Sequence, residues 1–237
     1  MGKAREGGAV NILTRRRFLQ VAGFATLGAT AGLAGCGERR NAADASSTAS
    51  ASSGSASSGD VTPAAQSGAS LVLVFSRAGE NYGVGTVKVG NTMVLAQMIA
   101  QKTGADLFEI ERAESYPEAY DACCDEALEE KNSDARPELA SMPDLSGYDT
   151  VYLGFPCWWG DMPMPVYAAI EALDWGGKTI CPFNTHAGSG DAGMFATVAR
   201  KCAGATVTDG LSMAGTTAQE DRAAAESQVD TWLASLR

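Results

Sequence analysis

Two adjacent tryptophans, Trp158 and Trp159, lie in the segment PCWWGDMP, directly after the apolar run TVYLGF. Neighbouring side chains of an extended chain point in opposite directions, so both indole rings cannot easily enter one core. An aromatic face stacks on a planar conjugated ligand and excludes water from it. This segment therefore predicts one wall of a site for a flat ligand. The alternative is that both rings fold back over the core, which is usual for isolated tryptophans.

A longer glycine-rich segment, SRAGENYGVGTVKVGNT, joins an earlier apolar run to a stretch with helical spacing. Hydroxyl and main-chain N–H groups at the head of a helix suit a phosphate, because the first turn has unpaired donors and the helix dipole favours an anion. Ser76, Asn91 and Thr92 could donate hydrogen bonds to a phosphate, and Arg77 could offset its charge. The same pattern also fits a simple turn and helix cap.

The only histidine of the chain, His186, lies in a third segment, NTHAGSGDAG. A lone histidine is more often a hydrogen-bonded structural residue than a functional one. This histidine follows a predicted strand, as the other two segments do, and Gly188 and Gly190 would let the main chain approach a ligand closely. One ligand with a phosphate and a planar conjugated ring accounts for all three segments, and FMN has both.

Short apolar runs alternate with amphipathic stretches along the chain. The runs predict strands at residues 71–75, 105–111, 150–156, 179–185 and 205–213, and the stretches predict helices at 91–104, 117–131, 165–173, 192–202 and 219–236. Five strands that alternate with helices predict an α/β fold with an open, mostly parallel sheet covered on both faces. Ligands bind such sheets beyond the carboxyl ends of the strands, and all three segments follow a strand.

The three segments resemble those of the flavodoxin-like family, in particular a bacterial branch with SRxGENY and GNT, then GxPxWWG, then THxGSG. Here they read SRAGENY and GNT, GFPCWWG, and THAGSG, in the same order and strand context, and the resemblance covers residues 71 to about 215. It implies a flavodoxin-like, doubly wound, five-stranded parallel sheet in the order 2-1-3-4-5. It also implies an FMN-binding domain at residues 71–237.

The resemblance assigns a part of FMN to each segment. It implies a phosphate held by Ser76, Arg77, Asn91 and Thr92, a ring lined by Pro156, Cys157, Trp158, Trp159 and Gly160, and a pyrimidine side and ribityl chain approached by Thr185, His186, Gly188, Ser189 and Gly190. We expect Trp159 to contact the ring and Trp158 to cover its edge or pack beneath it. Asp161, directly after them, should lower the reduction potential by disfavouring an anionic reduced flavin.

The first seventy residues do not resemble a globular sequence. TRRRFLQ and the weakly apolar stretch after it resemble a twin-arginine export signal with Gln20 in place of lysine, or an ordinary arginine-rich signal peptide. LAGC resembles a bacterial lipobox, in which Cys36 would carry the lipid; the alternative is that Cys36 is incidental. These features predict a signal at residues 1–36 and a flexible Ser/Ala/Gly spacer at 37–70.

The composition narrows the possible partners. The formal net charge is −10 at pH 7, and the basic N-terminal part makes residues 71–237 more acidic still, so nucleic acid is not expected as a partner. With one histidine and no Cys-x-x-Cys pair, a structural zinc site is not expected either. The cysteines after Cys36 are odd in number and are expected to be free thiols.

Three functions fit these observations. The first is an electron carrier between protein partners that have neutral or basic docking surfaces. The second is a reductase that uses a nicotinamide or a quinone, although no second dinucleotide-binding domain is visible. The third is a surface lipoprotein that binds a ligand or partner without redox turnover. Export to the outer face of the cell membrane favours the carrier, because reduced nicotinamide is scarce outside the cytoplasm and the twin-arginine route transports folded proteins with their cofactor.

Overall fold

The computed structural model describes residues 68–236 of the chain. The predicted export signal at residues 1–36, the lipidation site Cys36 and nearly all of the predicted spacer lie outside the described residues. Among residues 68–236, no helix combines the length and the apolar character that crossing a bilayer requires. The first strand begins at Ala69, slightly before the predicted domain boundary at residue 71.

A parallel sheet forms the centre of the described part. Its strands are β1 (Ala69–Val74), β4 (Asp106–Glu109), β5 (Tyr148–Pro156), β6 (Thr179–His186), β7 (Thr206–Val207) and β8 (Leu211–Ala214). The order across the sheet is β4-β1-β5-β6-β7, and β8 also pairs with β6. Because β7 and β8 share the place of a fifth strand, the predicted α/β fold with the order 2-1-3-4-5 is confirmed.

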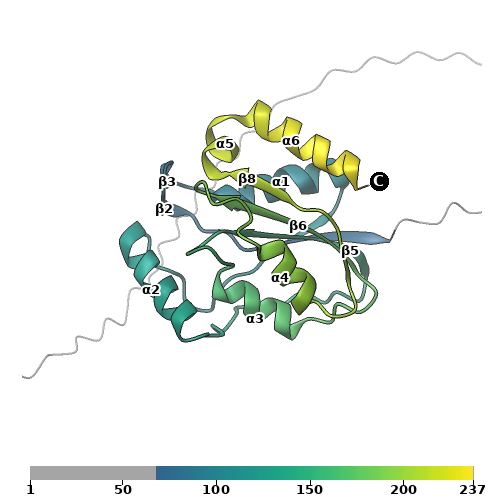
Figure 1. Ribbon diagram of the computed structural model, residues 1–237, viewed down its shortest axis with the longest axis horizontal. Coiled ribbons are helices and arrows are strands. Elements are labelled where there is room, and N and C mark those ends of the chain that lie inside the picture. The colour runs from purple at the N-terminus through teal and green to yellow at the C-terminus, as the bar shows by residue number, and fades with distance from the viewer. Residues whose placement is uncertain (1–67, 237) are drawn as a thin grey trace, which may run out of the picture. The chain divides into compact units, whose positions relative to one another are not determined.

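Helices cover both faces of this sheet (Figure 1). One face carries α1 (Asn91–Thr103), α5 (Gly215–Glu220) and α6 (Arg222–Ser235), and the other carries α3 (Met164–Ala172) and α4 (Met194–Lys201). In β1, Leu71 and Leu73 pack toward α3 and α4, whereas Val72 and Val74 pack toward α1 and α6. A strand buried on both faces in this way is typically a continuous run of branched apolar residues.

The predicted strand at 205–213 is interrupted between β7 and β8. The carbonyl of Asp209 accepts a hydrogen bond from the indole N–H of Trp232 at 3.0 Å. At Gly210, a Cβ atom would lie 2.4 Å from the ring of Phe195, so the chain passes too close to α4 for a larger residue. The strand bends at this point, and its two halves pair separately with β6.

The predicted helix at 219–236 also divides. Asp221 has non-helical dihedral angles (φ −127°, ψ 76°), and its carboxylate accepts a hydrogen bond from the main-chain N–H of Ala224 at 3.0 Å. An aspartate in this position caps the head of a helix. The helix α5 therefore ends before Asp221, and α6 begins after it.

Two elements lie beyond the carboxyl ends of the strands. A hairpin that we did not predict is formed by β2 (Gly79–Asn81) and β3 (Gly85–Val87). The predicted acidic helix is α2 (Tyr120–Asn132), which lies below this hairpin at the same end of the sheet (Figure 1). It buries only Cys123 and Ala127. Its placement beside the hairpin makes it part of the candidate site.

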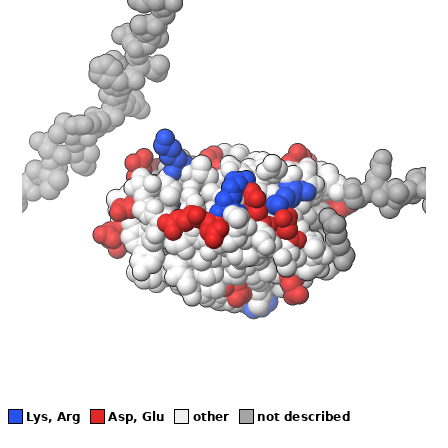
Figure 2. All heavy atoms as spheres, turned by 90° about the horizontal axis from the view of Figure 1, so that it is seen from above, with Lys and Arg blue, Asp and Glu red and all other residues white. Residues whose placement is uncertain are grey.

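The face that carries α5 and α6 has charged side chains of both signs (Figure 2). Lys102 of α1 pairs with Asp230 at 2.7 Å, and Arg222 pairs with Glu226 at 2.7 Å. Basic side chains on this face therefore lie next to carboxylates and do not gather into one continuous basic patch.

Candidate functional site

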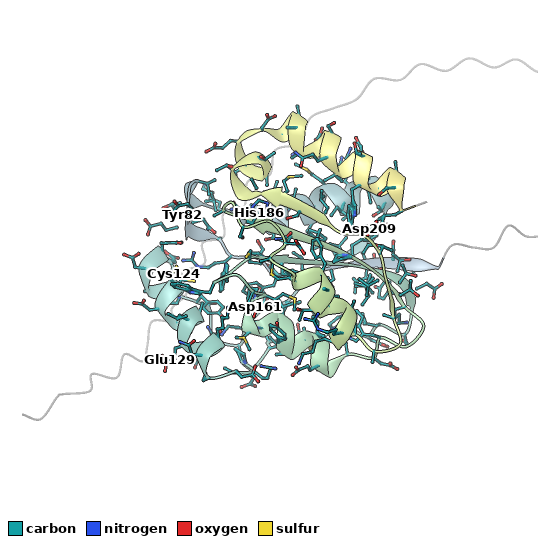
Figure 3. All side chains as sticks on the ribbon, viewed as in Figure 1. Tyr82, Cys124, Glu129, Asp161, His186 and Asp209 are labelled. Carbon is teal, nitrogen blue, oxygen red and sulfur yellow. The ribbon has the colours of Figure 1, made fainter. Side chains whose placement is uncertain are left out.

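A cavity of about 910 Å³ opens at the carboxyl ends of the strands, near the upper end of the range for small-molecule sites. It is lined by Arg77, Asn81, Tyr82, Gly83, Asn91, Tyr120, Asp121, Cys123, Cys124, Asp125, Ala127, Pro156, Cys157, Trp158, Trp159, Thr185, His186, Ala187, Gly188, Ala214, Gly215 and Thr216. Figure 3 shows Tyr82 and Cys124 at this end of the molecule and His186 further inward. The three predicted segments thus meet in one place, together with the hairpin and α2.

The predicted phosphate residues surround the head of α1. Ser76 Oγ accepts a hydrogen bond from the main-chain N–H of Met93 at 3.0 Å, so this hydroxyl caps the helix. Gly90 is needed there, because a Cβ atom would lie 2.3 Å from Ser76 Oγ. Thr92 is only 1% exposed, and its hydroxyl lies 2.7 Å from that of Thr185. Ser76 and Thr92 therefore hold α1 against the ends of β1 and β6, and neither lines the cavity.

Arg77 lines the cavity, but its guanidinium group is bonded to main-chain carbonyls. Nη2 donates to Pro117 at 2.5 Å and to Glu118 at 2.6 Å, and Nη1 donates to Glu80 at 2.6 Å. The carboxylate of Glu80 accepts a hydrogen bond from the main-chain N–H of Tyr120 at 3.0 Å. Arg77 thus fixes the hairpin to the start of α2, and the N–H groups used in this way are not available to a phosphate.

Asn91, the first residue of α1, lines the cavity and has one unpaired polar atom. Its side-chain oxygen is buried and has no hydrogen-bond partner within the described residues. Leaving such an atom unpaired costs roughly 1–3 kcal/mol. Gly215 leaves room for this amide, because a Cβ atom there would lie 2.4 Å from Asn91 Nδ2. Because this oxygen has almost no accessible surface, a ligand in the cavity would reach it only if the Asn91 amide turned.

The two tryptophans open a tight turn. The main-chain N–H of Trp158 donates to the carbonyl of Asp161 at 2.9 Å, and the N–H of Asp161 donates back at 3.0 Å. Trp159 and Gly160 between them have φ angles of 53° and 71°. Positive φ at both central residues is the pattern of a type I′ turn, which favours Asn-Gly. A tryptophan in the left-handed region is strained by roughly 1–2 kcal/mol.

Trp158 is packed from behind by aromatic rings. Its ring centroid lies 5.4 Å from that of Phe75 and 5.1 Å from that of Tyr116, both nearly perpendicular. The Tyr116 hydroxyl donates to Glu130, and the Arg112 guanidinium lies 4.1 Å above the Tyr116 ring and 3.3 Å from the Glu130 carboxylate. Burial is the main cause of the raised pKa values of Tyr116 and Glu130. Trp158 therefore forms a fixed floor of the cavity.

Trp159 is held by α2 and stays 51% exposed. Its indole N–H donates to the carbonyl of Cys124 at 3.0 Å, and its own carbonyl accepts a hydrogen bond from Lys131 Nζ at 2.6 Å. The ring is thus oriented by a helix while much of its surface is open. This arrangement agrees with Trp158 packing beneath the site; which ring contacts the cofactor stays a prediction.

Asp161 turns its carboxylate toward the protein. One oxygen accepts hydrogen bonds from the main-chain N–H of Met162 and from the Tyr167 hydroxyl, both at 2.8 Å. The other lies 3.9 Å from Lys131 Nζ. Asp161 does not line the cavity, so its predicted effect on a bound ring is weakened by this pairing.

The third predicted segment forms the inner wall. His186 Nδ1 accepts a hydrogen bond from the main-chain N–H of Gly188 at 2.9 Å, and burial lowers the pKa of His186. The ring is therefore neutral at pH 7 and carries its proton on Nε2. Ser189 Oγ donates to Cys157 Sγ at 3.1 Å, which joins this segment to the tryptophan turn. Gly188 and Gly190 have φ angles of 114° and 65°, which favour glycine.

Predicted site residues fall into two groups. Those that line the cavity are Arg77, Asn91, Pro156, Cys157, Trp158, Trp159, Thr185, His186 and Gly188, and those beside it are Ser76, Thr92, Gly160, Ser189 and Gly190. The residues beside it bond to or shape those that line it. Sequence reasoning missed the contributions of the hairpin and α2. The spacing of the buried Cys123 and Ala127 marks the inner side of α2, but not the surface that it faces.

The cysteines of the described part are free thiols, as predicted. Cys123, Cys124 and Cys157 line the cavity. Burial raises the pKa of the Cys123 thiol to about 11, so this group is protonated at pH 7.

A family model described as flavodoxin matches residues 85–230 of the chain. Among solved structures, candidate flavoproteins from Bacteroides uniformis and Bacteroides eggerthii are 27% and 24% identical, each with a TM-score of 0.57. The matches cover 71% of this chain and 99% and 97% of those chains. A flavoprotein from Lactobacillus acidophilus, solved in complex with FMN, is 21% identical with a TM-score of 0.51, over 70% of this chain and 99% of that one. No curated protein matches the chain.

Proposed function

Because the chain belongs to the flavodoxin family, we propose that its cavity binds FMN and that the protein transfers electrons between redox partners. The observation that carries this proposal is the cavity itself, which combines the half-exposed ring of Trp159 with the polar side chain of Asn91 at the head of α1. A planar ring and a polyhydroxyl chain would use these two features together. The Lactobacillus acidophilus flavoprotein that shares the fold was solved with FMN.

The residues of the cavity would divide the work of holding FMN. The bound cofactor would supply one- and two-electron redox chemistry. Asn91 and the first turn of α1 would face the phosphate and ribityl chain. The main-chain N–H groups and the dipole at the start of a helix favour an anion even where no free cation lies nearby. Pro156, Cys157 and Trp159 would exclude water from the ring. The neutral His186 would offer its Nε2–H as a donor.

We further propose that the protein is exported by the twin-arginine route and held at the outer face of the membrane by a lipid on Cys36. TRRRFLQ and LAGC support this proposal, together with the Ser/Ala/Gly spacer that follows them. Its redox partner proteins would then have neutral or basic docking surfaces, because the chain is acidic.

The visible spectrum of the purified full-length chain tests the redox proposal. We expect flavin absorption bands, either as isolated or after addition of FMN, and bleaching of these bands by dithionite. Protein that binds no FMN would contradict both the carrier and the reductase. It would favour a surface lipoprotein that binds a different ligand or partner on the same fold.

A second candidate function is a reductase for a small molecule. The observation that favours it is the part of the cavity wall that comes from the hairpin and α2, because no residue predicted to hold FMN lies there. Assays of the FMN-loaded protein with NADH, NADPH and quinones would separate this function from a carrier.

A further inference from the structure

One side of the cavity is left over when the residues predicted to hold FMN are set aside. We call this side the α2 wall and define it by Tyr82 of the hairpin and Tyr120, Asp121, Cys124 and Asp125 of α2. Arg77 donates a hydrogen bond to the carbonyl of Glu118, and the Glu80 carboxylate accepts one from the main-chain N–H of Tyr120, so the two elements are joined into one unit. Its residue types indicate what can bind against it.

The α2 wall exposes aromatic surface toward the cavity. Tyr82 is 66% exposed, and its ring centroid lies 6.1 Å from that of Tyr120 at an interplanar angle of 40°. Tyr82 and Trp159 are the two most exposed large hydrophobic residues of the described part, and both line this one cavity. Aromatic rings that stay exposed at the mouth of a cavity suit a planar ligand that stacks on them.

The charge of the α2 wall is negative. Asp121 and Asp125, four residues apart on α2, both line the cavity. Arg77 is the one Lys or Arg among the described lining residues, and its guanidinium is bonded to main-chain carbonyls. His186 is neutral at pH 7 because burial lowers its pKa. Lys131, the nearby lysine, is bonded to the tryptophan turn. A ligand with phosphates would meet carboxylates here and find no free cation.

We propose that the α2 wall binds a planar conjugated molecule without negative charge, of the quinone class, beside the FMN site, and that it disfavours NADH and NADPH. This inference rests on the proposed function only for the identity of the neighbouring cofactor. It separates the two small-molecule classes that the sequence left open. The diphosphate of a nicotinamide dinucleotide is repelled by Asp121 and Asp125, whereas a quinone has no charge for them to repel.

Equilibrium dialysis of the full-length protein, with and without FMN, tests the proposal. The probes are duroquinone, whose ring is fully substituted and so does not add to the thiol of Cys124, and NADH. We expect duroquinone to bind more tightly than NADH. Tyr82→Ala should weaken duroquinone binding about 3- to 10-fold, because a stacking partner is lost. Leu107→Ala, a change of a 40% exposed side chain on β4 that does not line the cavity, should leave binding unchanged.

A charge variant makes the selectivity test independent of stacking. Asp121→Asn combined with Asp125→Asn should strengthen NADH binding at least about threefold and leave duroquinone binding unchanged. NADH binding at least as tight as duroquinone binding, or a Tyr82→Ala variant that binds duroquinone normally, would overturn the proposal. Flavin fluorescence measures FMN binding separately. If duroquinone binds the FMN-free protein in a Tyr82-dependent way while FMN does not bind, the α2 wall is supported and the FMN proposal alone fails.

Discussion

Trp159 offers a direct test of how the tryptophan turn is built, because its side chain and its backbone make separable contributions. Trp159→Ala removes the ring and keeps a Cβ atom at a φ of 53°, whereas Trp159→Gly removes both. The lost ring contacts include the hydrogen bond to Cys124, which contributes about 1 kcal/mol, and the buried half of the indole, which contributes about 2 kcal/mol. The free energy of unfolding of Trp159→Ala should therefore be about 3 kcal/mol lower than that of the original protein.

The glycine variant should recover part of this loss. An L-residue in the left-handed region is disfavoured by about 1–2 kcal/mol, and glycine is not, but glycine loses about 0.5–1 kcal/mol of backbone entropy on folding. Trp159→Gly should thus be about 0.5–1 kcal/mol more stable than Trp159→Ala. Tyr82 is exposed and has no positive φ, so Tyr82→Gly should be less stable than Tyr82→Ala.

Equilibrium urea unfolding of the four variants measures both differences. Subtracting the Tyr82 pair from the Trp159 pair removes the entropy of glycine and leaves the strain of the turn, about 1–2 kcal/mol. An equal alanine-to-glycine difference at both positions would refute the strained turn. Trp159→Ala and Trp159→Gly should also weaken FMN binding to a similar extent, about 3- to 10-fold, because both lack the ring.

Three further changes test other parts of the molecule. The pKa of Glu171 is lowered to about 2, mainly by its hydrogen bond with Arg136, so the ionised carboxylate stabilises the fold at pH values above its unfolded pKa. Glu171→Gln should lower the free energy of unfolding at pH 7 by about 0.5–1 kcal/mol in urea unfolding. This difference should vanish as the pH falls from about 4.5 toward 2. Asp161→Asn should raise the midpoint potential of bound FMN less than Asp121→Asn in redox titration, because only Asp121 lines the cavity; a larger effect of Asp161 would restore the expectation from sequence. Cys36→Ala should move the exported protein from the membrane fraction to the soluble fraction, whereas an unchanged distribution would argue against lipidation.

The strands could be predicted because each buried strand is a short run of apolar residues in the sequence. Residues 71–74 are apolar throughout since both faces of β1 are covered, and the pairing of β1 with β4 and β5 follows from the parallel topology. The meeting of the three segments follows in turn, because parallel strands end at one edge. What the pattern cannot convey is where a marginally buried helix lies, and α2 buries only Cys123 and Ala127.

Arg77 shows that the type of a residue near the start of a helix does not determine which group it forms hydrogen bonds with. A cation before a glycine-rich helix head predicts a phosphate ligand, yet its guanidinium binds the carbonyls of Pro117 and Glu118 about forty residues away in the chain. Main-chain carbonyls are present in every segment, so the sequence has no signal for this contact. The hairpin escaped prediction for a similar reason, because its two strands are three residues each and mostly polar or glycine.

Features that lower the stability of a fold need a reason, and several of them coincide here. Two residues other than glycine with positive φ have local explanations or lie in exposed turns: Asp134 follows the end of α2, where a short polar residue is tolerated, and Ala192 lies in the turn before α4. Trp159 also lies in an exposed turn, but it is a large side chain where a type I′ turn favours asparagine. It lines the same cavity as the exposed ring of Tyr82. A planar ligand would cover the rings of Tyr82 and Trp159 that the protein leaves exposed, and the strained turn holds one of these rings at the cavity, so binding rather than stability best accounts for both features.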